Sequence, residues 1–298
     1  MSHWRLLNRS EIEDQKWNEM IAIASNEHIY GYTYYLDIVS SNWKGLIFGN
    51  YEALMPVSLK SKFGVKYLGQ INHIQRLNTF TNLSFIPSVN ELERLLLASV
   101  SYIDFVTQKK IFLSLSCAER VNLILPLNQT HDALRKFFKT NTQRGIKKAQ
   151  KSGAYFKESN KNSIVEAIEL FQSQKNYGLS KVWFQELKLI SVAHFAEMYA
   201  IELKGENVAF AMVLVSEKRV TLIFTALGEK GKEIGAMPLL ISELINKFSN
   251  SNKTFDFEGS DNAGTARFYS SFGAIAEKYY HYQSDGILKR TKELLKGK

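Results

Sequence analysis

The chain is poor in the features that mark disulfide-rich, metal-binding or membrane proteins. Cys117 is the only cysteine in 298 residues, which excludes an internal disulfide and a zinc site built from several cysteines. No apolar run approaches the roughly 20 residues of a membrane-spanning helix. The N-terminus MSHWRLLNRSEIED also lacks the apolar core of a secretory signal. We therefore expect a cytoplasmic protein without a membrane span.

Several catalytic signatures are also missing. The six histidines are scattered without metal-ligand spacing, and neither a Gly-x-Ser-x-Gly nor a complete Walker motif is present. Cys117 lies in SLSCA, among small and apolar residues without a nearby histidine, which is typical of a buried structural thiol. These absences argue against metal catalysis and against a serine nucleophile.

The composition predicts a globular protein with an anionic partner. Hydrophobic residues make up 45% of the chain and charged residues 22%, which is enough apolar material for packed cores. The formal net charge is +9, and the pI is near 9.3. Nucleic acid, a CoA phosphate and an anionic envelope precursor would each suit this charge.

The length predicts two domains, which we place at residues 1–128 and 129–298. In the first, Ser10 and Glu13 form a capping-box pattern before an amphipathic helix, and a hairpin turns at Gly49 and Asn50. A helix is expected over 89–107, followed by a strand over 110–115. The boundary is set where a strand gives way to a charged helix near Asn128.

The second half has a distinct order of elements. Three apolar segments between Tyr199 and Gly228 predict an antiparallel meander. A helix with apolar residues at helical spacing follows over 234–248, then the strand FDFEG, the short helix DNAGTARFYSSF and a last strand.

This order, together with the stretch NAGTARFYSSFGA, resembles the GNAT superfamily of acyltransferases. The matching positions are Asn262, Phe268, Tyr269 and Gly273. RGIKKAQKSG, IGAMPLL and FDFEGSDNAGTARFYSSFGA are more narrowly similar to the Fem-type families, which contain two GNAT-like domains in tandem. The resemblance implies an α/β (α+β) fold with two such domains, each a mixed, mainly antiparallel sheet flanked by helices.

The turn GEKGKEIGAM is the candidate binding site for the anionic part of an acyl donor. A helix N-terminus attracts phosphate, and Gly231, Gly235 and Ala236 permit close approach of a ligand there. The turn departs from the superfamily pattern of Gln or Arg, two residues, Gly, one residue, Gly or Ala, so Gly231 and Gly235 could equally serve only to shape the chain. Asn262 is expected either to bond a donor amide or to cap the following helix.

Two acidic residues and a tyrosine are the candidate chemical groups. In an extended FDFEG strand, Asp256 and Glu258 would share one face. We interpret Glu258 as a base that takes a proton from an attacking amine and Asp256 as a substrate contact, although each could instead pair with a lysine or cap a loop. The resemblance implies that Tyr269 lies near the donor sulfur as a general acid; its alternative is packing in the core.

The sequence therefore predicts transfer of an acyl group from acyl-CoA, such as acetyl-CoA, to a small-molecule or peptide-like amine, without a permanently bound cofactor. The Fem-type resemblance offers aminoacyl-tRNA as an alternative donor. Helical Arg144, Lys147, Lys148 and Lys151 could then contact RNA phosphates, or could form a solvated helix face. A noncatalytic module that binds nucleic acid or another anion is the third hypothesis.

Overall fold

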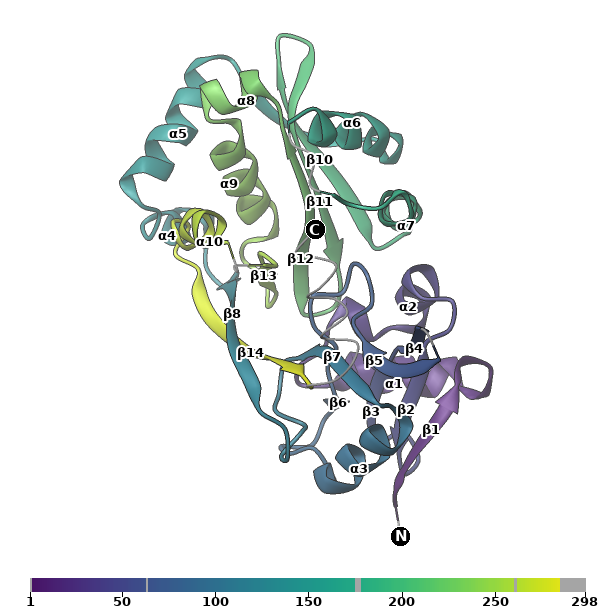
Figure 1. Ribbon diagram of the computed structural model, residues 1–298. Helices are drawn as coiled ribbons and strands as arrows, with labels where there is room; N and C mark the ends of the chain where they lie inside the picture. The colour runs from purple at the N-terminus through teal and green to yellow at the C-terminus, as the bar shows by residue number, and fades with distance from the viewer. Residues whose placement is uncertain (1, 63, 175–177, 260–261, 285–298) are drawn as a thin grey trace. The chain divides into compact units, whose positions relative to one another are not determined.

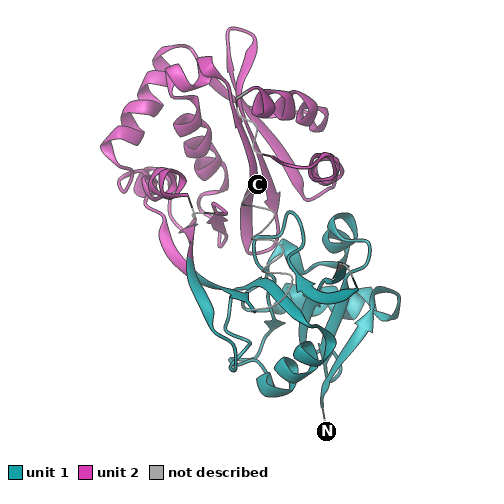
Figure 2. Cartoon of the chain, viewed as in Figure 1, with its two compact units in different colours: residues 1–120, 278–298 teal, residues 121–277 magenta. Residues whose placement is uncertain are grey.

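A computed structural model describes residues 2–62, 64–174, 178–259 and 262–284. The chain divides into two compact units (Figure 2): unit 1 holds residues 1–120 and 278–298, and unit 2 holds residues 121–277. The chain passes between the units within strands β8 (Cys117–Pro126) and β14 (Ile275–Gln283). This division differs from the boundary placed at residue 128, because the end of β8 pairs inside unit 2 while the end of β14 returns to pair with β7 in unit 1.

Unit 1 contains two sets of paired strands. One has the order β1-β2-β3-β6 and is antiparallel throughout. The other has the order β4-β5-β7-β14, in which only β5 and β7 are parallel. The elements are β1 (Trp4–Asn8), β2 (Lys44–Phe48), β3 (Ala53–Val57), β4 (Leu59–Lys62), β5 (Val65–Gly69), β6 (Phe80–Thr81), β7 (Tyr102–Thr107), α1 (Asp14–Ile23), α2 (Thr33–Val39) and α3 (Val89–Ser99).

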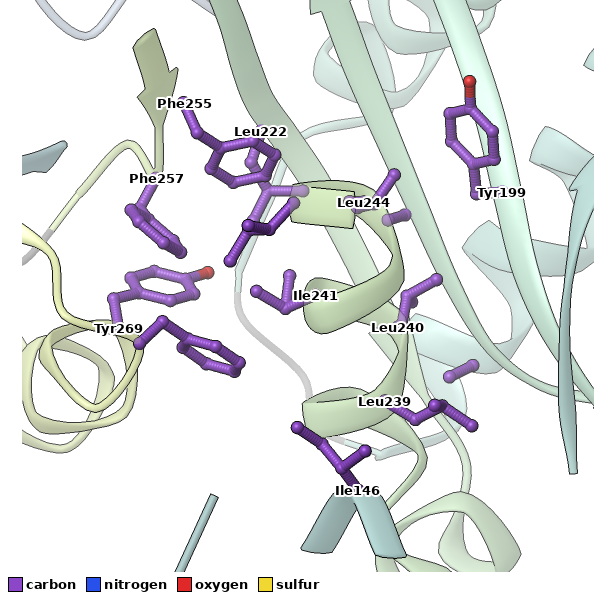
Figure 3. Packing of buried hydrophobic residues seen from close by; sticks show 14 of the residues in the cluster. Ile146, Tyr199, Leu222, Leu239, Leu240, Ile241, Leu244, Phe255, Phe257 and Tyr269 are labelled. Carbon is purple, nitrogen blue, oxygen red and sulfur yellow. The ribbon is translucent and has the colours of Figure 1, made fainter. Parts of the chain in front are cut away.

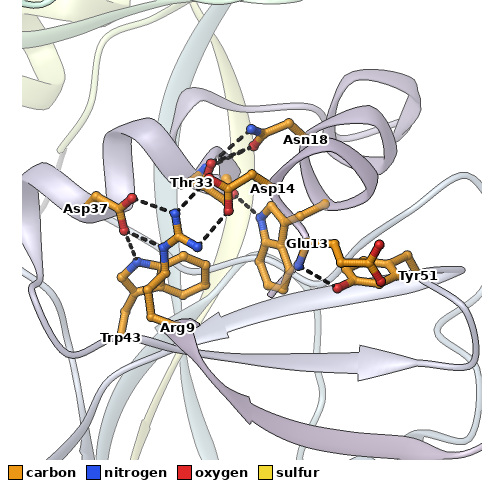
Figure 4. Close-up of polar contacts among 10 residues, drawn as sticks. Arg9, Glu13, Asp14, Asn18, Thr33, Asp37, Trp43 and Tyr51 are labelled. Carbon is orange, nitrogen blue, oxygen red and sulfur yellow. Dashed lines mark hydrogen bonds and ion pairs between the residues drawn. The ribbon is translucent and has the colours of Figure 1, made fainter. Parts of the chain in front are cut away.

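Helix α1 is fixed by buried aromatic and charged contacts. Trp17 and Ile21 are fully buried, and the Trp17 indole donates to the Gly31 carbonyl at 2.7 Å. Before α1, the Arg9 guanidinium donates to both Asp14 and Asp37 (Figure 4). The predicted capping box at Ser10 and Glu13 is wrong by two residues. Asn8 and Glu11 form the capping box, at the start of a 3₁₀ turn that precedes α1.

The prediction over 89–115 is partly wrong. Helix α3 ends at Ser99, and Tyr102 to Thr107 form strand β7, whose aromatic and β-branched residues suit a half-buried strand. The apolar segment 110–115 is not a strand. Its side chains Ile111 and Phe112 are buried, while Ser114 is held by the Glu93 carboxylate at 2.8 Å. The apolar side chains of this segment are therefore buried by a loop that is hydrogen-bonded to α3. Hydrophobicity alone does not distinguish such a loop from a strand.

Unit 2 contains six consecutive strands of a longer sheet, with helices on both faces (Figure 1). Their order is β8-β13-β12-β11-β10-β9, and the predicted meander is confirmed as β10 to β12. The elements are β9 (Tyr155–Ser159), β10 (Ala196–Leu203), β11 (Glu206–Val215), β12 (Arg219–Leu227), β13 (Thr254–Asp256), α4 (His131–Arg135), α5 (Thr140–Lys151), α6 (Ile164–Gln174), α7 (Lys181–Ser191), α8 (Glu229–Ile234), α9 (Ala236–Phe248) and α10 (Ala263–Ser270). None of the described helices is long and apolar enough to cross a bilayer.

The core of unit 2 forms between the sheet and helix α9 (Figure 3). Leu240, Ile241 and Leu244 of α9 are fully buried, at the spacing of one helix face. Phe255 and Phe257 extend this core toward α10, with ring centroids 4.9 Å apart. Phe257, the residue before Glu258, is thereby anchored to the core.

Candidate functional site

Strands β12 and β13 separate shortly after they begin to pair. They run parallel from Arg219 opposite Thr254 to Thr221 opposite Asp256, where β13 ends. Strand β12 continues to Leu227, and Ile223 is an extra residue in its pairing with β11. Such a bulge twists and re-aims a strand. In the described part of the chain, β13 therefore leaves one edge of β12 open beyond Thr221, where an extended ligand with amide groups can pair.

A cavity of about 600 Å³ opens beside the far end of β12. Its walls come from α6, β12, α8, α9 and α10, all within unit 2. The lining residues are Phe171, Thr225, Leu227, Gly231, Lys232, Gly235, Met237, Pro238, Gly264, Thr265, Phe268 and Tyr269. Three predicted positions, Gly231, Gly235 and Tyr269, thus meet at one cavity.

Tyr269 combines a cavity position with an anchored ring. It is 9% exposed, and its ring lies 4.9 Å from that of Phe257 between centroids. Figure 3 shows its hydroxyl pointing from α10 toward α9. Burial, together with the negative charge of Glu258, raises the pKa of the Tyr269 phenol to about 12. The phenol is consequently protonated at neutral pH and able to donate a proton.

Glu258 lies outside strand β13, contrary to the expected alternation with Asp256. The strand ends at Asp256, and Glu258 has a left-handed φ of 44°, an uncommon conformation for a residue with a side chain. Its backbone N–H donates to Asp256 Oδ1 at 3.1 Å. Since the Glu258 charge acts on the Tyr269 phenol, the turn brings a carboxylate and a proton donor into the same neighbourhood.

Asp256 is fully buried in a polar network and is not among the residues that line the cavity. Its carboxylate accepts from Asn122 Nδ2 and from Arg219 Nη1, each at 2.8 Å. Arg219 Nη2 also donates to Glu277 at 2.6 Å. Burial lowers the pKa of the Arg219 guanidinium, but the charges of Asp256 and Glu277 outweigh burial and raise it. The arrangement favours a structural role for Asp256 over the predicted substrate contact.

The glycines of the predicted anion site have packing reasons of their own. A Cβ on Gly231 would lie 2.3 Å from the Val208 carbonyl oxygen, so only glycine lets α8 approach β11 this closely. Gly235 has a φ of 81°, and a Cβ there would lie 2.8 Å from the Gly145 carbonyl oxygen. Helix α5 thus packs against the N-terminus of α9, and Ala236 is fully buried. This packing agrees with the alternative that Gly231 and Gly235 only shape the chain. Phosphate binding at these glycines stays a prediction.

Asn262 caps helix α10. Its Oδ1 accepts from the backbone N–H groups of Gly264 at 2.9 Å and Thr265 at 3.1 Å. Of the two roles considered for this side chain, the structure shows the cap.

Replacing Asn262 with alanine should lower the free energy of unfolding by about 1 kcal/mol, because two N–H groups of α10 lose their acceptor. Asn262→Asp should stay close to the parent, since aspartate caps equally well. Urea unfolding followed by circular dichroism measures both variants. Equal stability of Asn262→Ala and the parent would contradict the cap as a stabilising contact.

Sequence reasoning missed most of the cavity wall. Thr265 precedes Tyr269 by about one helical turn, so helical spacing was a usable signal for it. Phe268 directly precedes Tyr269 and already belongs to the motif quoted for the GNAT resemblance. Phe171 and Thr225 come from α6 and β12, and nothing local in their sequence marks them. Arg219 was equally hidden, because its partners Asp256 and Glu277 are distant in the chain.

Helix α5 carries an exposed basic face on the side away from its buried residues Thr142, Ile146 and Ala149. Arg144, Lys147, Lys148 and Lys151 are all exposed, and recur at intervals of three and four residues on one helix face. Within the described ranges none of the four has an ion-pair partner, whereas the exposed Lys230 is paired with Glu206. The same helix approaches the cavity, since a Cβ on Gly145 would lie 3.1 Å from Pro238.

Comparison with solved structures identifies the fold. FemX aligns with a TM-score of 0.63 at 11% identity, over 94% of this chain and 98% of FemX. L-PGS from Bacillus licheniformis aligns with a TM-score of 0.60 at 11% identity, over 95% of this chain and 96% of that chain. A tandem GNAT protein from the clavulanic acid biosynthesis pathway gives 0.52 at 8% identity, over 94% and 98%. No protein-family model matches the sequence, and no curated protein does. The chain thus has the Fem-like tandem GNAT fold predicted from its motifs.

Proposed function

We propose that unit 2 is an N-acyltransferase that moves an acyl group from an activated donor to an amine. One observation carries the proposal. The cavity beside the open edge of β12 contains a protonated phenol, Tyr269, whose pKa is raised in part by the neighbouring Glu258 carboxylate. An acid and a base of this kind can assist acyl transfer to an amine by donating a proton to the leaving group and accepting one from the amine. The fold shared with FemX and with a tandem GNAT protein is compatible with this reaction class.

The reaction assigns one proton transfer to each group. The amine nitrogen attacks the acyl carbonyl carbon, and Glu258 accepts the proton that the nitrogen loses, directly or through a water. The bond from the carbonyl carbon to the donor sulfur then breaks, and Tyr269 protonates the departing thiolate. With an oxygen ester as the donor, an alkoxide leaves instead, and the thiol-specific role of Tyr269 lapses. Positioning of the two reactants along β12 supplies much of the remaining rate enhancement.

An acyl-CoA is the first donor to test, as a co-substrate and not as a resident cofactor. Purified protein would be mixed with acetyl-CoA or longer acyl-CoAs and a panel of small amines and amino-terminal peptides. Mass spectrometry of the amines reports acylation, and calorimetry reports donor binding. Acylated amine would support the proposal. The absence of detectable binding heat with every acyl-CoA would remove CoA as the donor.

Aminoacyl-tRNA is the second candidate donor, and the basic face of α5 favours it. Four exposed cations without described ion-pair partners lie on one face of α5, and a helix face of this kind can contact a phosphate backbone. The same helix packs through Gly145 against Pro238 of the cavity lining.

Charge reversal on α5 tests whether tRNA binds to this helix. The double variant Lys147→Glu/Lys148→Glu should bind tRNA at least about tenfold more weakly, and should lower the slope of log K against log salt by about two, one for each lost phosphate contact. Lys109→Glu/Lys110→Glu changes the net charge equally at exposed positions of unit 1 and should have little effect. Equal losses in the two variants would indicate a diffuse charge effect and contradict a site on α5.

The noncatalytic alternative has its own signature. A module that only holds nucleic acid would bind tRNA in a salt-dependent gel shift that Glu258→Gln leaves unchanged, and would form no acylated amine from either donor. Product from one donor, abolished by Glu258→Gln, would exclude it.

A further inference from the structure

The cavity wall is chemically uneven, and most of its side chains are apolar. Phe171, Leu227, Met237, Pro238 and Phe268 line it together with three glycines. Its polar side chains are two threonines, Tyr269 and Lys232, and its lining contains no carboxylate and no side-chain amide. A pocket of this composition binds an apolar group and orients it through few polar contacts.

The apolar side chains are held in place by ordered packing behind them. The Phe171 ring of α6 lies 5.3 Å from Phe224 and 6.3 Å from Phe184, measured between centroids. The Phe268 ring of α10 lies 5.2 Å from Phe272 in an edge-on contact. Figure 1 shows α6 and α10 on opposite sides of β12. Aromatic walls that reach one cavity from both sides form a preorganised surface for a flexible chain, which lowers the ordering cost of binding.

The size of the cavity exceeds the needs of the smallest acyl group. Its volume of about 600 Å³ lies within the roughly 300–1,000 Å³ of pockets that enclose drug-sized ligands. An acetyl group contributes a single methyl to such a space. With an acetyl donor the apolar wall would have to be covered by another part of the donor, whereas a longer acyl chain makes those contacts itself.

We propose that the group transferred is an apolar acyl chain of about six or more carbons, with its carbonyl at Tyr269 and its chain against Phe171, Met237 and Phe268. This inference rests on the proposed acyl transfer and names the substrate class of the same site. The chemistry disfavours an α-amino group on the chain, because the cavity lining has no carboxylate to pair with a buried ammonium. Glu258 lies near Tyr269 but outside the lining, and its carboxylate is assigned to the proton of the attacking amine.

Binding of unreactive analogues tests the preferred length of the acyl chain without requiring turnover. The probes are N-(2-acetamidoethyl) alkanamides with acyl groups from acetyl to octanoyl, in which NH replaces the thioester sulfur. Calorimetry with the full chain should show Kd falling about fourfold for each added methylene, since each methylene leaves water for the apolar wall. A Kd that stays constant from acetyl to octanoyl would overturn the inference, because the wall would then serve another part of the donor.

A matched pair of variants tests where the acyl chain of the probe binds. Thr265→Leu adds bulk to the lining and should weaken octanamide binding at least about tenfold while changing the acetamide less than about twofold. Arg267→Leu adds the same side chain to the exposed side of α10, outside the lining, and should change neither. Equal effects of the two variants on the octanamide, or equal effects of Thr265→Leu on both chain lengths, would contradict the assignment.

A second pair of probes separates acyl from aminoacyl groups. The hexanamide and its 2-amino derivative have the same carbon chain, and we expect the amino derivative to bind at least about tenfold more weakly. Equal or tighter binding of the amino derivative would overturn the inference. Chain-length-dependent binding without any acylated amine would instead count against the proposed function while the chain site stands. Efficient acetyl transfer with chain-independent binding would leave the function in place and remove the chain site.

Discussion

Replacing Glu258 with glutamine should lower kcat for acyl transfer by about 10²–10⁴-fold, the usual contribution of a positioned general base. Glutamine preserves the size of the side chain but cannot accept the proton of the attacking amine. Tyr269→Phe should cause a loss of similar order with a thioester donor, since the phenol is the group that protonates the leaving thiolate. Initial rates of product formation at saturating donor and amine measure both effects.

The two catalytic variants need controls for fold and for cooperation. Glu233→Gln removes a carboxylate from the exposed side of α8 and should leave kcat unchanged. The double variant Glu258→Gln/Tyr269→Phe should lose far less than the product of the single losses, because residues that act in one step are not additive. Full turnover by both single variants would remove the catalytic assignment from both residues.

Replacing Arg219 with methionine should destabilise unit 2 by about 3–5 kcal/mol, because it leaves the buried Asp256 carboxylate without its cation. The pair joins β12 to β13 at 2.8 Å, and the two side chains are 11% and 0% exposed. Loss of this network would also release the Asp256 carboxylate that accepts the Glu258 N–H. Urea unfolding followed by circular dichroism gives the free energy change.

An exposed ion pair provides the matched control. Lys230→Met breaks the ion pair with Glu206, in which the two side chains are 64% and 56% exposed. The variant should lower the free energy of unfolding by at most about 1 kcal/mol, because solvent screens the pair. If Arg219→Met cost no more than Lys230→Met, burial would not govern the strength of the network, and a structural role for Asp256 would lose its basis.

The part of the site that sequence predicts best is local in the chain. Glu258, Asn262 and Tyr269 all lie in the segment FDFEGSDNAGTARFYSSFGA that suggested a Fem-type fold. Even here, alternation failed between Asp256 and Glu258. Extended geometry stops at Asp256, and Glu258 adopts a left-handed conformation that depends on a hydrogen bond to the Asp256 side chain.

The predicted anion site shows a different limit. Two glycines near a helix start suggest a phosphate cradle, but the same glycines permit close packing of backbones. The choice at Gly235 depends on Gly145, which lies in α5 and is remote in the chain. A sequence pattern cannot show which segment occupies the space above a glycine.

The sequence by itself determined the type of most elements in unit 2, the order of its meander and the strand, turn and helix around Tyr269, because these follow from periodicity and short-range motifs. Tertiary structure alone decided which residues enclose the cavity, that Asp256 is buried in an ion-pair network, and where the chain passes from one unit to the other. Those properties arise from contacts between α6, β12 and α10 and among β8, β12, β13 and β14, whose residues are separated by long stretches of chain. Side-chain burial and pairing across such separations are settled only when the segments pack.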